Sequence, residues 1–334
     1  MATGSIHPVG KVALSNLWDD LLLDKGGPFG PTELEIKLVL DSSLAPATIR
    51  SYSHHLSEFN NFLHTQGLST RYPHGEITIM QFLLNKKKRG VQYSTLQGYV
   101  SAVGFAHKMR GQPDPTATFF FRKFMRGLQR MAHLRQQLQP ISYNRLLELE
   151  NLVFQLYTDV YTKTMLRALM SLLYHACLRV SEVTVSTTAD HAIKTADLVF
   201  MGKPPVRTPD AVTVTLQSFK HSRSSQTIQV YRSLNKAICP VLLLHDYYQL
   251  RPTSRYVFCH PSGSPLTRQF ITKWLSQLVA ASSFRDQKIN THSFRIGRTT
   301  DLVLQGNVSD TYIQHVGRWS STAYRKYIRS VVVL

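Results

Sequence analysis

The sequence predicts a mainly α-helical protein that carries one small antiparallel β-sheet and is organised as two domains. Apolar residues recur at helical spacing over most of the chain, and three short β-rich runs stand close together in its second half. A polar, proline-containing segment at 136–142 separates an all-helical part from a mixed one and is the predicted linker. The 334 residues are enough for two domains that each bury a core of their own.

Residues 1–32 are predicted to form a tail, because the Gly- and Pro-rich run 26–31 interrupts the chain. Within this tail, the amphipathic stretch Leu14–Leu23 is a candidate docking helix. Residues 33–135 are predicted to form a small helical domain, in which Ala45-Pro46-Ala47-Thr48 has the composition of a helix start. The expected helical runs are 33–40, 49–62, 77–87, 94–109 and 116–131.

Residues 143–334 are predicted to form the mixed domain. Two helical runs, 143–156 and 161–178, come first, and the pattern then changes to the alternation and branched residues of β-strands. The expected strands are 197–200, 212–216 and 227–231. The helical runs that follow are 240–250, 267–281, 292–305, 309–315 and 320–329, with an extended piece at 256–258.

Charge indicates the class of partner. The chain has 39 Lys plus Arg against 20 Asp plus Glu, a formal net charge of +19 that predicts a polyanionic partner. No stretch has the roughly 18 to 20 apolar residues of a membrane span, so nucleic acid is expected rather than a membrane. Three widely spaced cysteines without a CxxC pair, and no secretory signal, predict an intracellular, reducing location and no zinc site.

A basic cluster, Lys86-Lys87-Lys88-Arg89, lies at the end of a predicted helix. It is compatible with a nuclear import signal, with contacts to DNA phosphates, or with an ordinary solvated helix terminus.

The last part of the chain concentrates residues that suit phosphate chemistry. His292 and Arg295 stand three apart, so on a helix they share a face and can point at one target, such as a phosphodiester. Taken alone, such a pair is more often an exposed polar face. Trp319 offers an indole N–H donor, and Tyr324 and Tyr327 each offer a phenol that could act as a nucleophile.

Two upstream elements complete the set. Arg179 follows an apolar helix, where a charge is costly without a partner, and Glu182 one turn later is positioned to orient it. A purely structural salt bridge is the alternative. Lys220 lies between two predicted strands, at a hairpin tip that suits proton delivery, although Arg223 competes for that role and a solvated lysine is the commoner outcome.

In this order and spacing, the elements resemble the tyrosine recombinases, the phage-integrase-like DNA strand-exchange enzymes. The resemblance covers about residues 33–330, and the helical domain is similar to their core-binding domain. Three sequence motifs are most similar to those of recombinases from DIRS-type retrotransposons and Cryptons: Thr291–Gly297, Gly317-Arg318-Trp319 and Tyr327-Ile328-Arg329. Bacterial members more often have Leu-Gly-His where this chain has Gly-Arg-Trp.

The resemblance implies a reaction. A tyrosine attacks the phosphodiester to give a 3′-phosphotyrosine link and a free 5′-hydroxyl, and a second strand reverses the attack, through a Holliday junction. The bond energy is conserved, so no ATP is expected. No metal or other cofactor is expected either, because two arginines and the general acid–base groups would do what a metal does elsewhere. The two domains are expected to form a C-shaped clamp on duplex DNA, and binding is expected to weaken steeply with salt.

The resemblance also implies roles. Arg179, oriented by Glu182, and Arg295 would hold the negative charge of the pentavalent transition state. His292 would help to take the phenol proton, and Lys220 would protonate the departing oxygen. Trp319 would donate its indole N–H to the phosphate and pack the site.

Two tyrosines compete for the role of nucleophile. Tyr327 is favoured because it has the Tyr-Ile-Arg context and lies eight residues after Trp319, close to the family spacing of about nine. Tyr324 lies only five residues after Trp319.

Some residues depart from the family pattern or extend it. Arg298 stands where relatives often have a small residue, so it is either a further phosphate contact or a packing change, whereas His315 is expected to pack or to face solvent. The further candidate DNA contacts are Arg318, Arg223, Lys86, Lys87, Lys88 and Arg89. Seven residues follow Tyr327, too few for the docking helix of many relatives, so Leu14–Leu23 is the hypothetical substitute.

The sequence thus predicts a nuclear recombinase of a mobile element that binds double-stranded DNA and self-associates on it as a dimer or tetramer. Two alternatives stay open. One is a domesticated DNA-binding protein that has lost catalysis, and the other is a type IB topoisomerase or telomere resolvase, which shares the chemistry.

Overall fold

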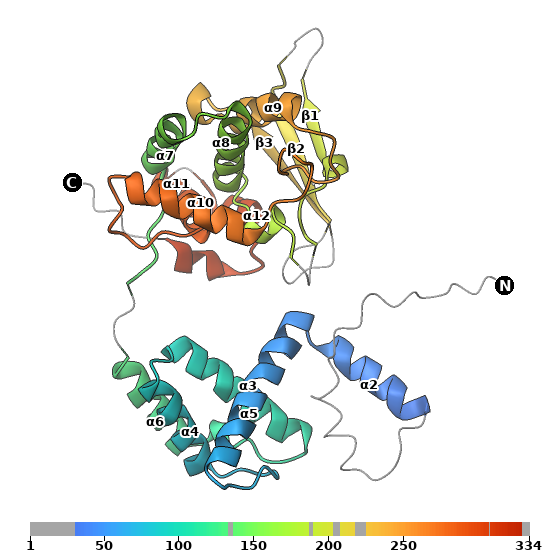
Figure 1. The fold of residues 1–334 in the computed structure, drawn as a ribbon, viewed down its shortest axis with the longest axis vertical. Coiled ribbons are helices and arrows are strands. Elements are labelled where there is room, and N and C mark those ends of the chain that lie inside the picture. The colour runs from blue at the N-terminus through green and yellow to red at the C-terminus, as the bar shows by residue number, and fades with distance from the viewer. Residues whose placement is uncertain are drawn as a thin grey trace, which may run out of the picture. The chain divides into compact units, whose positions relative to one another are not determined.

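The computed structural model describes residues 31–132, 136–186, 190–202, 208–217, 225–306 and 308–328. The chain folds into two compact units, Met1–Arg135 and Gln136–Leu334, which are considered one at a time (Figure 1). The candidate docking helix Leu14–Leu23 lies outside the described residues. The predicted clamp concerns the placement of one unit relative to the other and stays a prediction.

In its described part, the first unit consists of helices joined by loops. Its helices are α2 (Pro31–Ser43), α3 (Pro46–Thr65), α4 (Glu76–Lys88), α5 (Tyr93–Met109) and α6 (Phe119–Arg130), with a 3₁₀ turn at Pro115–Ala117. Aromatic rings dominate its core: Phe59, Phe82 and Phe121 are fully buried, and the rings of Phe59 and Phe82 meet edge to face with centroids 5.1 Å apart.

Local caps decide where α6 begins. The sequence predicts one helical run over 116–131, but the side chain of Asp114 accepts a hydrogen bond from the Thr116 backbone N–H and starts a separate short turn. The Thr118 hydroxyl then accepts from the Phe121 N–H at 3.1 Å, so the helix proper starts at Phe119.

Two histidines are buried in the first unit and bonded to each other. The backbone N–H of His74 donates to Nε2 of His107 at 3.0 Å, and Nδ1 of His107 lies 2.8 Å from the Val103 carbonyl oxygen. This pattern fixes a neutral imidazole at His107, with one nitrogen accepting and the other donating. Burial lowers the pKa of both, that of His74 to about 4.

The second unit combines helices with a three-stranded antiparallel sheet of order β1-β2-β3, formed by Leu198–Met201, Ala211–Leu216 and Gln226–Tyr231. Val212 pairs with Phe200 on one side and with Val230 on the other. The main helices are α7 (Tyr143–Leu156), α8 (Val160–His175), α9 (Pro240–Leu250), α10 (Arg268–Ala281), α11 (His292–Leu304) and α12 (Asp310–Gly317). In Figure 1 the sheet lies at one side of this unit with α9 against it.

Two helices differ from the prediction. The run 161–178 is expected to be helical throughout, but α8 ends at His175 because Cys177 adopts a left-handed φ of 51°. The last run, 320–329, forms only the 3₁₀ helix Thr322–Tyr327. Both changes turn the chain sharply beside the residues of the predicted site.

The predicted linker is partly integrated into the second unit. Ile141 is fully buried, and its N–H donates to the Ser293 carbonyl at 2.9 Å. Gly297 on α11 permits this approach, because a Cβ there would lie 1.7 Å from the Ile141 carbonyl oxygen. The contact fixes the start of α11, where His292 and Arg295 lie. None of the described helices has the length and apolar character needed to cross a bilayer.

Candidate active site

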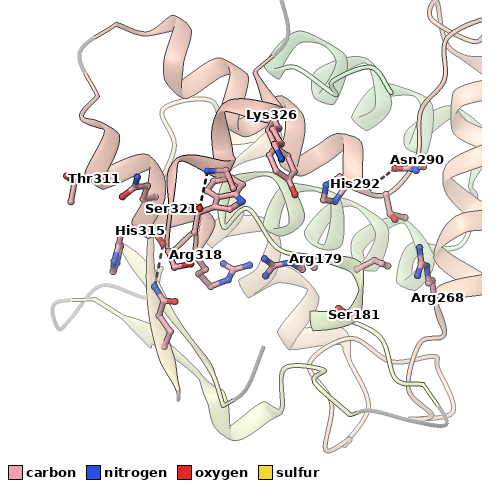
Figure 2. Close-up of a pocket in the computed structure, with 18 residues that line it drawn as sticks. Arg179, Ser181, Arg268, Asn290, His292, Thr311, His315, Arg318, Ser321 and Lys326 are labelled. Carbon is pink, nitrogen blue, oxygen red and sulfur yellow. Dashed lines mark hydrogen bonds between the residues drawn. The ribbon is translucent and has the colours of Figure 1, made fainter. Parts of the chain in front are cut away.

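A pocket of about 1110 Å³ opens in the second unit between segments that are far apart in the sequence. Figure 2 shows Arg179 and His292 on adjacent sides of it. Its lining comprises Arg179, Val180, Ser181, Gln226, Arg268, Asn290, Thr291, His292, Thr311, Gln314, His315, Arg318, Trp319, Ser320, Ser321, Ala323, Lys326 and Tyr327. Most of these side chains are polar or basic, which suits an anionic ligand.

Three predicted residues meet at one end of the pocket. The Tyr327 ring lies 5.1 Å, centroid to centroid, from both the His292 ring and the Trp319 ring. The Thr300 hydroxyl donates to the Tyr327 carbonyl oxygen at 3.2 Å, which ties the 3₁₀ helix to α11. A phenol beside an imidazole is the arrangement that base-assisted attack requires.

His292 is the first residue of α11, and its backbone is held by a local turn. Its N–H donates to the Asn290 side-chain oxygen at 2.8 Å, and the Asn290 N–H donates to the Ser293 hydroxyl at 3.2 Å. These bonds take up donors that a helix start leaves free. They also hold the imidazole at the pocket wall.

Arg179 is held by Glu182, as predicted. The two Glu182 oxygens accept from the Arg179 guanidinium at 3.1 Å and from its backbone N–H at 2.8 Å. The Glu182 side chain is 1% exposed and that of Arg179 is 20% exposed. The carboxylate therefore lies in the protein interior, and the guanidinium lies on the side of the pocket. A cation anchored in this way is preorganised for an anion in the pocket.

Arg295 lies behind the pocket rather than in it. Its guanidinium donates to the Cys177 carbonyl at 2.6 Å and to the Gly317 carbonyl, and it sits 4.2 Å from the Trp319 ring centroid. The residue is fully buried, and burial lowers its pKa. The predicted shared face with His292 therefore does not point both side chains at one target. The two carbonyls draw Arg295 inward.

Gly317 brings Trp319 close to the backbone. A Cβ at this position would lie 1.6 Å from the Trp319 ring, so only glycine leaves room for the indole. The Trp319 ring in turn covers Arg295 and borders Tyr327.

Arg318, a predicted DNA contact, is buried instead of exposed. Its side chain is 0% exposed and forms an ion pair with Glu182 at 2.6 Å. Burial lowers its pKa to about 10, which leaves it charged at neutral pH. Arg318 borders the pocket, but its guanidinium is engaged by the Glu182 carboxylate and by backbone carbonyls instead of pointing at a ligand.

Lys86 is a second correction. It is 7% exposed, pairs with Glu58, and lies 5.5 Å from the Phe82 ring centroid. Its ammonium stabilises the first unit instead of contacting DNA. Lys88 and Arg89 are exposed at the end of α4, and Lys87 contacts the Met131 sulfur.

The structure describes some of the remaining candidate residues but not others. Lys220 and Arg223 lie outside the described residues, so the predicted hairpin lysine stays a prediction. Arg298 is absent from the pocket lining, and its guanidinium lies 5.6 Å from the Tyr174 ring centroid, which favours the packing alternative. His315 is exposed, which is one of the two predicted outcomes, but it also lines the pocket, which the sequence did not predict.

The two tyrosines have different environments. Tyr324 is 2% exposed and packs into a small apolar cluster with Cys177 and Ile313. Tyr327 is partly exposed and lines the pocket beside His292. The geometry favours Tyr327 as the nucleophile, because a buried phenol cannot reach a phosphodiester.

Sequence reasoning missed several lining residues, including Arg268, Asn290, Gln226 and Lys326. Lys326 adjoins Tyr327 in the sequence, so its position gave a signal. Arg268, the first residue of α10, belongs to no motif that could have identified it, and only the tertiary structure brings it to the pocket.

A basic face on α6 was also missed. Four exposed side chains, Arg122, Lys123, Arg126 and Arg130, fall within about 100° of the helix circumference. The i, i+4, i+8 spacing of the three arginines could have revealed it. Such a stripe is the electrostatic footprint of a polyanion-binding surface.

Comparison with known proteins identifies the family of the chain and solved structures of similar fold. The sequence pattern of the phage integrase family matches residues 146–331. None of the curated proteins compared with this chain matches it.

Several solved structures share the fold. The XerH site-specific recombinase in a post-cleavage complex with a palindromic difH substrate has a TM-score of 0.60 and 14% identity, over 95% of this chain and 85% of that one. The Tn1549 transposon integrase in complex with transposon right-end DNA has a TM-score of 0.58 and 13% identity, over 96% of both chains. A lambda integrase dimer bound to a COC′ core site has a TM-score of 0.59 and 13% identity, over 94% and 85%.

Proposed function

The chain belongs to the phage integrase family, and from that membership we propose that it is a site-specific DNA recombinase that cuts and rejoins strands through a phosphotyrosine link. One observation carries the proposal. Tyr327, His292, Trp319 and Arg179, which come from three distant parts of the sequence, line one pocket, and the first three are in ring contact. This combination supplies a nucleophile, a base and a cation for a phosphodiester.

The proposed step begins at the Tyr327 hydroxyl. Its oxygen attacks phosphorus and forms a new P–O bond, while the bond to the 5′-oxygen breaks. His292, whose ring centroid is 5.1 Å from that of Tyr327, assists removal of the phenol proton. The leaving oxygen takes a proton from a general acid, a role that we assign to Lys220. Attack by a 5′-hydroxyl from another strand reverses the step, so no external energy is used.

Positive charge stabilises the developing negative charge. Arg179 faces the pocket, and its position is set by the buried Glu182. Arg295 adds a second cation behind Trp319, close enough to act electrostatically through the enclosed protein interior. Removing a preorganised donor of this kind costs about 100- to 1000-fold in rate.

The first unit supplies affinity in this proposal. Its α6 face carries Arg122, Lys123, Arg126 and Arg130 in exposed positions, where they can neutralise phosphates without reading sequence. We propose duplex DNA as the ligand and self-association on it. Lambda integrase, a relative in fold, forms a tetramer bound to a Holliday junction. A DIRS- or Crypton-type mobile element as the source, and the nucleus as the location, are part of the same proposal.

The test is covalent capture. The protein is incubated with a library of nicked duplexes that carry randomised sequence around the nick, and the DNA that stays attached in denaturant is recovered and sequenced. Wild type is expected to form an adduct through a 3′-phosphate, and Tyr327→Phe to form none. Tyr324→Phe is the matched control, because it removes a phenol three residues away, and it is expected to keep the adduct.

The outcomes separate the alternatives. An adduct that persists in Tyr327→Phe refutes that nucleophile, and loss of the wild-type adduct in EDTA refutes metal-independent cleavage. Relaxation of supercoiled DNA without exchange of strands between two duplexes would indicate a topoisomerase. Binding without any adduct would indicate a protein that has lost catalysis.

A further inference from the structure

Arg318 occupies a backbone conformation that arginine rarely adopts. It follows α12 with φ 55° and ψ 51°, the left-handed region in which glycine is favoured. For a residue with a side chain this conformation costs about 1 kcal/mol or more. Glycine would adopt this conformation without that cost, so the arginine side chain is expected to contribute something that glycine lacks.

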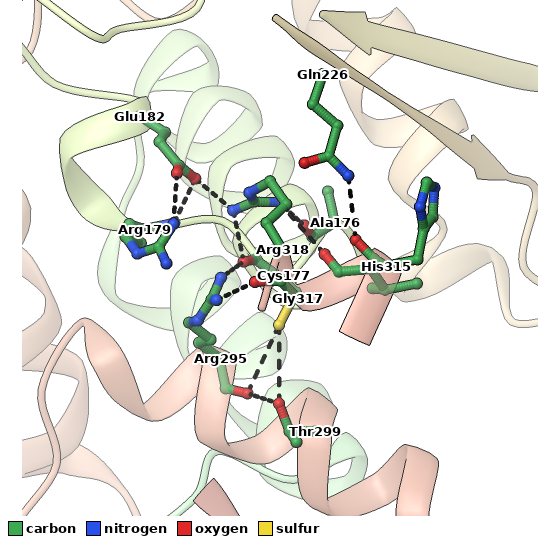
Figure 3. Close-up of polar contacts among 11 residues, drawn as sticks. Ala176, Cys177, Arg179, Glu182, Gln226, Arg295, Thr299, His315, Gly317 and Arg318 are labelled. Carbon is green, nitrogen blue, oxygen red and sulfur yellow. Dashed lines mark hydrogen bonds and ion pairs between the residues drawn. The ribbon is translucent and has the colours of Figure 1, made fainter. Parts of the chain in front are cut away.

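The buried side chain joins two halves of the site. Its guanidinium donates to the Ala176 and Cys177 carbonyls at 3.2 and 3.1 Å, which are groups left free at the end of α8. It also donates to Glu182 at 2.6 Å. Arg318 is covalently next to Trp319, so one residue connects the segment that carries Trp319 to the segment that carries Arg179. Figure 3 shows this network.

Glu182 is the shared member. Its Oε2 accepts from Arg318 and from the Arg179 backbone N–H, while its Oε1 accepts from the Arg179 guanidinium at 3.1 Å. Loss of the Arg318 cation would leave this carboxylate, which is 1% exposed, with Arg179 as its partner in the network. The Arg179 guanidinium would then be drawn toward Glu182 and away from the pocket.

We propose that Arg318 is a positioning residue. Through Glu182, it fixes the position of the Arg179 side chain relative to Trp319 and Tyr327. The inference rests on the proposed function, because it concerns the same pocket. Arg318 itself does not contact the phosphate. It keeps Glu182 partnered, so that Arg179 remains available to the phosphate, and it locks the α8 end to the segment after α12.

The chain offers a matched control. Arg167 on α8 also pairs with a buried carboxylate, Glu150, at 2.7 Å, with side chains 18% and 2% exposed. Neither residue lines the pocket. Arg167→Met therefore breaks a buried Arg–Glu pair of the same unit without touching the site, and it reports what such a loss does to stability alone.

The experiment measures three quantities for the full chain: the single-turnover cleavage rate at saturating nicked duplex, the Kd for that duplex, and the unfolding temperature. Arg318→Met is expected to slow cleavage about 100-fold, the cost of a small misplacement of a catalytic group, with Kd within about threefold of wild type. Arg167→Met is expected to lower the unfolding temperature while its rate stays within about threefold.

A double-mutant cycle tests whether Arg318 affects the cleavage rate through Glu182. Glu182→Gln and Arg318→Met each slow cleavage, and if Arg318 acts through Glu182, the double variant is about as slow as the slower single variant. Fully multiplicative effects would overturn the inference, as would an Arg318→Met rate equal to that of Arg167→Met.

If Arg318→Met does not fold, Arg318→Lys decides. Lysine keeps the charge but cannot reach three acceptors with a planar fork, so an intermediate loss of rate of about tenfold is expected. A wild-type rate in this variant would overturn the inference. A wild-type protein that forms no adduct would instead refute the proposed function, and the inference with it.

Discussion

The two units use arginine in opposite ways. On α6 of the first unit, Arg122, Arg126 and Arg130 are exposed, whereas Arg295 and Arg318 in the second unit are fully enclosed. An exposed guanidinium is screened by water and salt and contributes to affinity by neutralising phosphates. A buried one is fixed by carbonyls and carboxylates and organises its surroundings. In the proposed function, the same residue type thus serves DNA binding in one unit and catalysis in the other.

The largest effect is expected at Arg179, which is anchored like the buried arginines but faces the pocket. Arg179→Met is expected to lower the single-turnover cleavage rate about 1000-fold, because it removes a preorganised cation from the transition state. The Kd should change by less than about fivefold. A variant that loses affinity and keeps its rate would show that Arg179 is a binding residue.

The next largest effect is expected on α6. The triple variant Arg122→Gln/Arg126→Gln/Arg130→Gln should weaken DNA binding about 10- to 100-fold at physiological salt, and should reduce the slope of log K against log salt by about 3 if each arginine contacts one phosphate. Its cleavage rate at saturating DNA should be that of wild type.

A charge-retaining triple, Arg122→Lys/Arg126→Lys/Arg130→Lys, is the control. It should keep most of the affinity, because phosphate neutralisation requires charge rather than a planar fork. An unchanged salt slope in the glutamine variant would show that this face does not bind DNA.

The first unit also contains a buried cation, Lys86, beside the exposed cations Lys88 and Arg89. The contrast between buried and exposed cations can therefore be tested within this unit. Lys86→Met should lower the free energy of unfolding by about 1 kcal/mol through loss of the pair with Glu58, with DNA affinity unchanged. Exposed Lys88→Gln should do the reverse, with unchanged stability and slightly weaker binding. Denaturant titration and binding isotherms distinguish the two.

The smallest effect concerns pH. The pKa of His74 is lowered from 6.5 to about 4 by burial, so its neutral form favours the folded state. This stability is complete above pH 6.5 and is lost as pH falls toward 4, because the unfolded chain binds the proton first. The first unit should therefore melt a few degrees lower at pH 5 than at pH 7.

The matched variant for the pH effect is His74→Phe, since the Phe59 and Tyr72 rings already surround this position. It should remove part of the pH dependence of melting. A variant whose melting temperature falls as much as that of wild type would assign the dependence to other groups, of which His107 is the first to examine.

The fold class, the family and the candidate site residues could be predicted from the sequence, because these depend on local patterns. Helical and strand periodicity follow from which neighbours share a face, and Arg179, Glu182, His292, Trp319 and Tyr327 were identified from residue type and order. Tyr324 and Tyr327 carry the same phenol, and the sequence favoured Tyr327 through its Tyr-Ile-Arg context and its spacing from Trp319.

Tertiary structure decided which charges are buried. Arg295 turns inward to carbonyls of Cys177 and Gly317, and Arg318 to Glu182, partners from 22 to 136 positions away in the chain. Burial is a property of such long-range contacts, so no local pattern distinguishes an enclosed arginine from an exposed one. The same reason separates Tyr324, packed against Cys177 and Ile313, from Tyr327 at the pocket.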